Sequence, residues 1–188
     1  MEIVLNSDVE FQKVNLYFQD ESRFGLLTRN GKMLTAKGVK PICKFQHVFQ
    51  STYLYGAFSP IDGSSLLMEL PQCNGENFQL FLNEMSQQNP EEYKIMVLDN
   101  GAFHKAKTLK VPKNIALMFL PAYSPELNPA EKMWAIIKRK FSNVFCETLE
   151  DISAFLDSAE TRFTNESIKK TCSYSYIFNN LQWTNSSL

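Results

Sequence analysis

Residues 93–141 read YKIMVLDNGAFHKAKTLKVPKNIALMFLPAYSPELNPAEKMWAIIKRKF. The stretch contains two compact apolar runs, 93–98 and 115–120, of the kind found in strands buried inside a sheet. A helix is expected after the second run, with Asn128 as its cap and Pro129 at its first position. The apolar side chains of this helix recur at helical spacing and form one core stripe, made of Ala130, Met133, Trp134, Ile137 and Phe141.

The segments before residue 93 predict further strands and one helix. Residues 14–19 alternate apolar and polar side chains like a short strand, which ends at Asp20. Residues 51–58 and 64–70 flank the turn sequence Ser-Pro-Ile-Asp-Gly and predict a hairpin. Asn74 is a plausible cap for the helix that follows. Its apolar face is formed by Phe78, Phe81, Leu82 and Met85, and Pro90 marks its end.

The rest of the chain predicts two helices and a tail. A short helix is expected at 105–110, and a final one begins near Thr148, with Asp151 as its capping-box partner. Beyond about residue 164 the pattern fades into a polar, loosely held tail. We therefore expect an N-terminal extension at 1–13, one domain at 14–163 and a C-terminal tail at 164–188. The domain is α/β, with a mixed sheet and helices on both faces.

Composition narrows the class of protein. The 188 residues are 44% hydrophobic and 21% charged, which is typical of one globular domain. No apolar run approaches the roughly 20 residues that span a bilayer, and the first residues lack the features of a secretion signal. A cytoplasmic protein without a membrane partner is expected. The four cysteines lack the spacing of a zinc site, which favours reduced thiols.

Charge is distributed unevenly along the chain. The formal net charge is −1, but residues 105–140 carry eight basic residues against two acids, a local charge of +6. From 145 to 166 the sign reverses, with six acids against one arginine. A basic tract is often only a solvated surface. This one flanks two of the three acids discussed next, which favours a surface that faces phosphate.

Three acidic residues stand out by their positions. Asp20 and Asp99 each follow a strand-like run, and Glu131 lies one turn into a helix. Side chains at the ends of adjacent central strands meet at one edge of an open α/β sheet, where such folds bind ligands. The same helix could aim Glu131 at this edge and Lys138, two turns later, at a nearby phosphate.

Each acid also has an alternative interpretation without a site. Glu131 lies three residues after Asn128 and suits a capping box. Asp99 begins an Asp-Asn-Gly turn sequence. Asp20 and its neighbour could be solvated loop charges. His104 is either a surface residue or a hydrogen-bond donor to one of the metal-binding side chains, and the sequence does not separate these.

Electrostatics explains why three converging acids imply a metal. Two like charges about 4 Å apart repel by about 1 kcal/mol in water and about 4 kcal/mol at an effective dielectric near 20. Mg²⁺ or Mn²⁺ suits ligands that are all oxygen and leaves positions for water and phosphate. Two such ions, roughly 3.5–4 Å apart, can activate a hydroxyl and stabilise a leaving oxygen.

Five segments resemble the catalytic domain of DDE transposases of insertion sequences in the mariner-like superfamily. The resemblance covers roughly residues 14–163, and its last motif is highly specific. The segments are QDESRFG at 19–25, KGVKP at 37–41, YGAFSP at 55–60, VLDNGAFHK at 97–105 and LPAYSPELNPAEKMW at 120–134.

The resemblance implies a ribonuclease H-like fold with a five-stranded sheet and a metal-binding catalytic triad of Asp20, Asp99 and Glu131. Such enzymes hydrolyse DNA at transposon ends and use the freed 3′-hydroxyl to attack target DNA. A homodimer on DNA is the expected assembly. Asn100 and His104 match family positions beside the second acid. A signature expected to set the last helix for structural reasons is matched by Tyr123, Ser124, Pro125, Asn128 and Trp134. Phosphate contacts, rather than catalytic roles, are expected of Lys105, Lys138 and Arg139.

Two departures from the family pattern leave alternatives open. The 31 residues between Asp99 and Glu131 are slightly fewer than is common. No helix-turn-helix DNA-binding module precedes Asp20, so the chain is expected either to work with a separate N-terminal helix-turn-helix polypeptide or to be a decayed copy. The competing functions are a non-catalytic DNA-binding protein of the same fold and another ribonuclease H-like nuclease.

Overall fold

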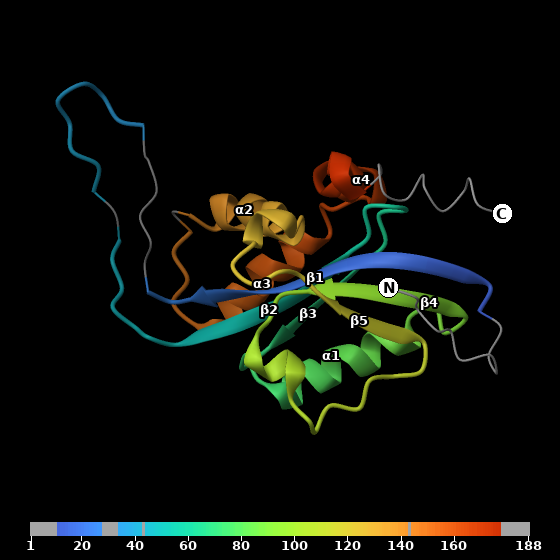
Figure 1. Cartoon of the computed structure of the whole chain (residues 1–188). Helices are drawn as coiled ribbons and strands as arrows, with labels where there is room; N and C mark the ends of the chain where they lie inside the picture. The colour runs from blue at the N-terminus through green and yellow to red at the C-terminus, as the bar shows by residue number, and fades with distance from the viewer. Residues whose placement is uncertain (1–10, 28–33, 43, 143, 178–188) are drawn as a thin grey trace.

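The computed structural model describes residues 11–27, 34–42, 44–142 and 144–177 of the chain. Within these residues five strands form one sheet (Figure 1). The strands are β1 Lys13–Gly25, β2 Ser51–Phe58, β3 Ser65–Leu70, β4 Glu92–Leu98 and β5 Ile115–Phe119. Their order across the sheet is β3-β2-β1-β4-β5.

The sheet is mixed because the connections between its strands differ in length. β2 pairs antiparallel with both β1 and β3, and a tight turn at 59–63 joins β2 to β3. β4 pairs parallel with both β1 and β5, and α1 (Gly75–Gln87) provides the crossover into β4. The mixed five-stranded sheet and the hairpin expected from the sequence are confirmed.

Helices cover both faces of the sheet, as expected (Figure 1). α1 lies on one face, and the other face carries α2 Ala130–Phe141, α3 Leu149–Glu160 and α4 Asn165–Cys172. Two of the expected caps form, because the Asn74 side chain accepts a hydrogen bond from the Asn77 N–H and Thr148 forms a capping box with Asp151. The third is wrong, since α2 begins at Ala130 with Pro129 at the cap position, one residue later than expected. Two short 3₁₀ helices, Ala102–Lys105 and Pro125–Leu127, follow β4 and β5.

Alternate side chains along β1 enter different cores. Tyr17 packs with Phe78, Phe81 and other α1 residues on one face. Phe24 packs with Trp134, Ile137 and further residues of α2, α3 and α4 on the other. The predicted stripes of α1 and α2 are buried accordingly, although Phe141 is only partly covered. This alternation assigns the even-numbered residues of β1, including Asp20, to the α2 face.

β1 is longer than the sequence predicts. It does not end at Asp20 but continues to Gly25, because β2 supplies an opposite residue in the antiparallel ladder for each position from Phe18 to Gly25. Ser22 and Phe24 are buried on the α2 face within this extension. Asp20 is therefore a strand residue and not a loop charge. Pairing with β2 decides the conformation that the local polar sequence leaves open.

The C-terminal segment also differs from the expected loose tail. Thr164 caps a further helix, α4, whose Ile168 and Cys172 are buried against the α2 side of the molecule. The boundary at residue 164 thus falls at the start of a packed helix. Residues 178–188 of the expected tail and 1–10 of the expected extension lie outside the described residues.

Two smaller expectations are wrong in position. The short helix is a 3₁₀ turn at Ala102–Lys105, and no helix forms at 106–110. The last strand, β5, is at the sheet edge rather than buried inside it, which leaves Met118 and Phe119 partly exposed. Among the described residues, no helix has the length and apolar character needed to cross a membrane.

Candidate active site

The register of two parallel strands places Asp20 and Asp99 at the same level of the sheet. Phe18 is opposite Val97 in the β1–β4 ladder, and each acid lies two residues further along its strand direction. Asp20 therefore falls on the α2 face, and Asp99 follows the last residue of β4 at the same edge of the sheet. The sequence predicted this convergence from the strand ends, and the parallel pairing provides it.

The third acid comes from α2, whose start is fastened to β1. The Asn128 Nδ2 donates to the Gln19 carbonyl oxygen at 3.0 Å, and the Asn128 Oδ1 accepts from the Ala130 N–H at 3.1 Å. Asn128 is almost fully buried. Its two bonds join the first turn of α2, which carries Glu131, to the residue before Asp20.

Asp20, Asp99 and Glu131 line one pocket of about 450 Å³, which we call the acidic pocket. Its other walls come from the loops after β4 and β5, namely Asn100, Gly101, residues 120–125 and Asn128. Asp99 and Glu131 are exposed, whereas Asp20, which lies within β1, is partly buried. Three elements distant in sequence thus present carboxylates to one opening.

The structure excludes two of the three alternative interpretations of the acids. α2 begins after Pro129 without a side-chain cap, so Glu131 is not a capping-box glutamate. Asp20 lies within a strand. Asp99 does form a turn, since its Oδ1 accepts from the Gly101 N–H at 2.8 Å, yet it lines the acidic pocket as well.

Trp134 holds the Asp20 carboxylate in place. Its indole Nε1 donates to Asp20 Oδ2 at 2.9 Å, and the indole packs edge-on against Phe58. Gly56 lies opposite Asp20 in the β1–β2 ladder and leaves room for the indole. A Cβ at Gly56 would lie 2.5 Å from the Trp134 Cη2 atom. The glycine is therefore needed for a close approach rather than for an unusual backbone angle.

Replacing Gly56 with alanine is expected to destabilise the protein and displace Trp134. Overpacking of a core typically costs about 1–3 kcal/mol, which corresponds to roughly 2–12 °C in Tm for a chain of this size. Thermal unfolding and indole fluorescence measure both effects. Gly75→Ala is the matched control, because a Cβ there meets its nearest side chain at an ordinary 3.7 Å. Equal Tm values for the two variants would show that the indole does not need Gly56.

The environment of Asp20 disfavours its charged form. Burial, together with the negative charges of Glu21 and Glu131, raises the pKa of Asp20 to about 7. The hydrogen bond from Trp134 opposes this shift but does not cancel it. A charged carboxylate without a counter-ion is therefore unfavourable at this position, and a nearby cation would stabilise it.

The donor set suits a hard divalent cation, but it is not assembled around one in this structure. The three carboxylates offer only oxygen ligands, as Mg²⁺ and Mn²⁺ prefer. Within the described ranges, no group of three or more His, Cys, Asp or Glu residues is close enough to hold a metal ion. The exposed side chains of Asp99 and Glu131 share the acidic pocket with Asp20 without closing on it.

His104 is buried behind Asp99 and bridges two acids. Its Nε2 contacts Glu21 Oε1 at 3.1 Å, and its Nδ1 lies 2.9 Å from Asp99 Oδ1 without forming a hydrogen bond. Burial favours the neutral ring, but the hydrogen bond with Glu21 and the charges of Glu21 and Asp99 outweigh it and raise the pKa of His104. His104 therefore has the position expected of a residue that supports Asp99, and it is not a surface residue.

Sequence reasoning missed Glu21 as part of this arrangement. Gln19 Nε2 donates to Glu21 Oε1 at 2.7 Å, so the carboxylate that contacts His104 is itself held. Glu21 points to the α1 face while its neighbour Asp20 points to the α2 face. Two adjacent acids in one strand point to opposite faces of the sheet, so the sequence could have assigned Glu21 a separate role. That inference requires the segment to be recognised as a strand.

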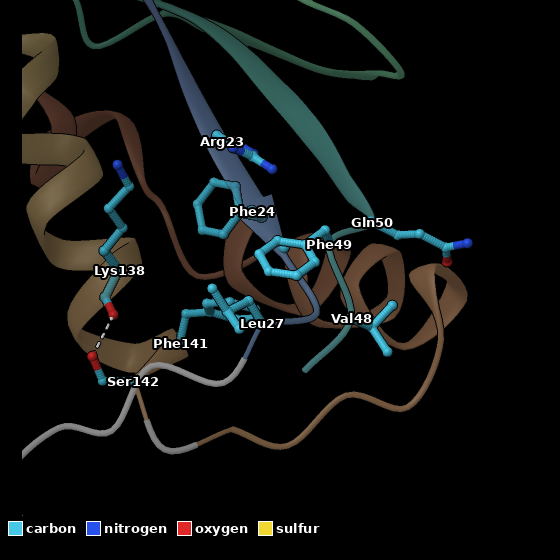
Figure 2. A pocket seen from close by; sticks show the side chains of 10 residues that line it. Arg23, Phe24, Leu27, Val48, Phe49, Gln50, Lys138, Phe141 and Ser142 are labelled. Carbon is cyan, nitrogen blue, oxygen red and sulfur yellow. Dashed lines mark hydrogen bonds between the residues drawn. The ribbon is translucent and has the colours of Figure 1, made fainter. Parts of the chain in front are cut away.

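The other predicted residues are placed in two separate areas. Asn100 lines the acidic pocket, and Lys105 Nζ donates to Asn100 Oδ1 beside it. Lys138 does not line the acidic pocket but a second one, shown in Figure 2. Arg139 is exposed on α2 and is a lining residue of neither pocket.

Tyr123 differs from the structural role expected of it. Its side chain is fully exposed, and its backbone adopts a φ of 60° that non-glycine residues rarely take. The residue lines the acidic pocket next to Ser124 and Pro125. A packing role thus applies to Asn128 and Trp134, but not to Tyr123.

Comparison with known proteins identifies the family to which the chain belongs. The family model described as DDE superfamily endonuclease matches residues 15–153, which is most of the chain and includes all three acids. The chain belongs to the DDE superfamily endonucleases. It is also 37% identical over 102 residues to the uncharacterized protein y4pE/y4sA of Sinorhizobium fredii, covering 53% of this chain and 76% of that protein.

This DDE superfamily endonuclease shares its fold with Mos1 transposase. A pre-cleavage Mos1 transpososome superposes with a TM-score of 0.66 at 16% identity, over 84% of this chain and 52% of Mos1. The Mos1 strand transfer complex gives 0.64 at 17% identity, over 84% and 50%. The chain thus spans about half the length of the Mos1 chains. The ribonuclease H-like fold predicted from the sequence is confirmed.

Proposed function

We propose that this chain is the catalytic domain of a transposase, a metal-dependent DNA endonuclease and strand transferase that acts on transposon ends. The observation that carries the proposal is the meeting of Asp20, Asp99 and Glu131 in one pocket of a DDE superfamily endonuclease. We assign the three carboxylates as the ligands of two Mg²⁺ or Mn²⁺ ions. The bound ions would lower the barrier by activating the attacking hydroxyl and stabilising the leaving oxygen.

The described residues divide the remaining work. Trp134 and Asn128 fix the orientation of Asp20 and the first turn of α2. His104, held by Glu21, lies beside Asp99 and supports it. Asn100 and Lys105 form a polar pair at the rim, where Lys105 can contact a DNA phosphate.

Partners follow from the same proposal. Mos1 was solved as a paired-end complex with Mn, as one with Mg, and as a strand transfer complex. By analogy we propose transposon-end and target DNA as substrates in the cytoplasm, a homodimer on DNA, and a separate N-terminal helix-turn-helix polypeptide as partner. Exposed lysines and arginine on α2 suit the phosphate backbone of such DNA.

Metal removal is the first test. The chain is expected to nick supercoiled plasmid DNA with Mn²⁺ or Mg²⁺ and to lose this activity in EDTA by about a thousandfold or more, because the ions contribute several kcal/mol to the transition state. Saturating Mg²⁺, at about 100 times its Kd, should also stabilise the fold by about 2.7 kcal/mol, which a thermal melt detects. Agarose gels measure the nicking.

Glu131→Gln and Glu126→Gln form the matched pair for this test. Both glutamates are exposed and lie five residues apart, but only Glu131 lines the acidic pocket. The first variant should lose nicking and the second should keep it. Equal nicking by both would remove Glu131 from the proposal, and a wild-type chain that binds DNA without any nicking would identify a non-catalytic or decayed relative.

A further inference from the structure

A second pocket lies on the same face of the sheet, further along β1 and α2. It has a volume of about 280 Å³, and we call it the aromatic pocket. Its lining residues include Phe24, Leu27, Val48, Phe49, Phe141 and Lys138 (Figure 2). Phe24 and Phe141 form its floor in an edge-on ring contact of 5.3 Å, whereas Phe49 is 67% exposed at its rim. Phe49 thus presents an aromatic ring to solvent at the opening of the pocket.

The aromatic surface extends from this rim along the chain segment that enters β2. Phe45, His47 and Phe49 alternate along extended backbone and therefore share one side of it. The ring centroids of His47 and Phe49 are 4.7 Å apart, and the ring centroids of Phe45 and His47 are 6.2 Å apart. All three side chains are exposed. Figure 1 shows that the segment before β2 extends outward beyond the helices of the domain.

The charge of this segment selects the kind of ligand. Residues 34–42 and 44–50 contain three exposed lysines, Lys37, Lys40 and Lys44, and no acid. Arg23 and Lys138 add two further cations among the residues that line the pocket (Figure 2). Cations interleaved with exposed aromatic rings fit nucleic acid, since phosphates pair with the cations and bases stack on the rings. A purely apolar protein partner would make no use of the lysines.

The geometry of two shared elements relates this surface to the acidic pocket. Lys138 lies seven positions after Glu131 in α2, which is about 10 Å of helix. Phe24 lies four positions after Asp20 in β1, which is about 13 Å of strand. Because stacked nucleotides rise about 3.4 Å each, DNA whose phosphate lies at the acids would bring a nucleotide about three or four positions away to the aromatic pocket.

We infer that the aromatic pocket accepts an unpaired base of the DNA strand that the acidic pocket acts on. Phe49 stacks on the base, and Lys138 with the lysines of residues 34–50 holds the adjoining phosphates. The inference rests on the proposed function for its choice of DNA. It adds a binding site that can be tested without cleavage.

The test measures binding of a fluorescent single-stranded dT12 oligonucleotide to the whole chain in EDTA, by anisotropy. Phe49→Ala and Phe49→Leu should each weaken binding about fivefold or more, whereas Phe49→Trp should retain it, because stacking needs an aromatic face. An oligonucleotide of equal length made of abasic sites should bind wild type and all three variants alike. Leu80→Ala, an exposed apolar residue on α1, serves as the control.

Each other outcome overturns the inference. Equal dT12 affinity of wild type and Phe49→Ala, or no dT12 binding by wild type, would exclude base stacking here. Weaker self-association of Phe49→Ala in sedimentation, with unchanged dT12 affinity, would assign the surface to a second copy of the chain. Metal-dependent nicking retained in any of these cases would leave the proposed function standing. Phe49 is exposed, so its variants should melt like wild type.

Discussion

Replacing Asp99 with asparagine is expected to abolish metal-dependent nicking while leaving the fold intact. The amide keeps the side-chain oxygen that accepts from the Gly101 N–H, and the residue is exposed, so little stability is at risk. The variant loses the negative charge that a divalent cation needs. Because bound metal contributes several kcal/mol to such reactions, nicking with Mn²⁺ should fall by about a thousandfold or more. Plasmid nicking rates and a far-UV spectrum measure the two expectations.

Asp157→Asn is the matched control for this variant. Asp157 is an exposed acid on α3 and lines neither pocket. Its variant should nick like wild type, which shows that a loss in Asp99→Asn is not a general effect of lowering the negative charge. Unchanged nicking by Asp99→Asn would refute the assignment of Asp99 as a ligand, whatever the fold.

Much of the fold could be predicted from local patterns because those patterns agree with the tertiary structure. The turn sequence between β2 and β3, the period of 3.6 in α1 and α2, and the caps at Asn74 and Thr148 all specify their elements locally. The predictions are wrong where tertiary contacts, rather than the local sequence, determine the conformation. The polar second half of β1 is a strand because β2 pairs with it. α4 is stabilised by burying Ile168 and Cys172, although its sequence is mostly polar.

The candidate site divides in the same way. The proximity of Asp20 and Asp99 could be predicted because side chains at the ends of adjacent strands lie at the same edge of the sheet. The contact of Glu21 with His104, the space that Gly56 leaves for Trp134, and the exposure of Tyr123 depend on which residues lie opposite each other across strands and loops. Lys138 was expected near the acids by helical spacing alone, but two turns of helix carry it to the next pocket.

The negative charges around the acidic pocket should lower the free energy of unfolding of the metal-free protein. The titration of Asp20 makes this effect measurable. Its pKa is raised to about 7 from an ordinary value of 3.8 by burial and by the charges of Glu21 and Glu131. An acid with a raised pKa binds its proton more tightly in the folded state than in the unfolded state. The free energy of unfolding should therefore fall as pH rises from about 4 to about 7, and stay low above that.

Asp20→Asn should remove this pH dependence and make the metal-free protein more stable at pH 8. A shift of about three pKa units corresponds to about 4 kcal/mol, or roughly 10 °C in Tm for a chain of this size. The asparagine oxygen can still accept the Trp134 indole N–H, so the difference should vanish below pH 4, where both side chains are neutral. Thermal melts in EDTA across pH 4–8 measure it. Added Mg²⁺ should then stabilise wild type but not the variant, because the cation offsets the like charges only where the carboxylate remains. A variant that melts below wild type at pH 8 would show that the Asp20 charge stabilises the fold, contrary to the cost that its burial implies.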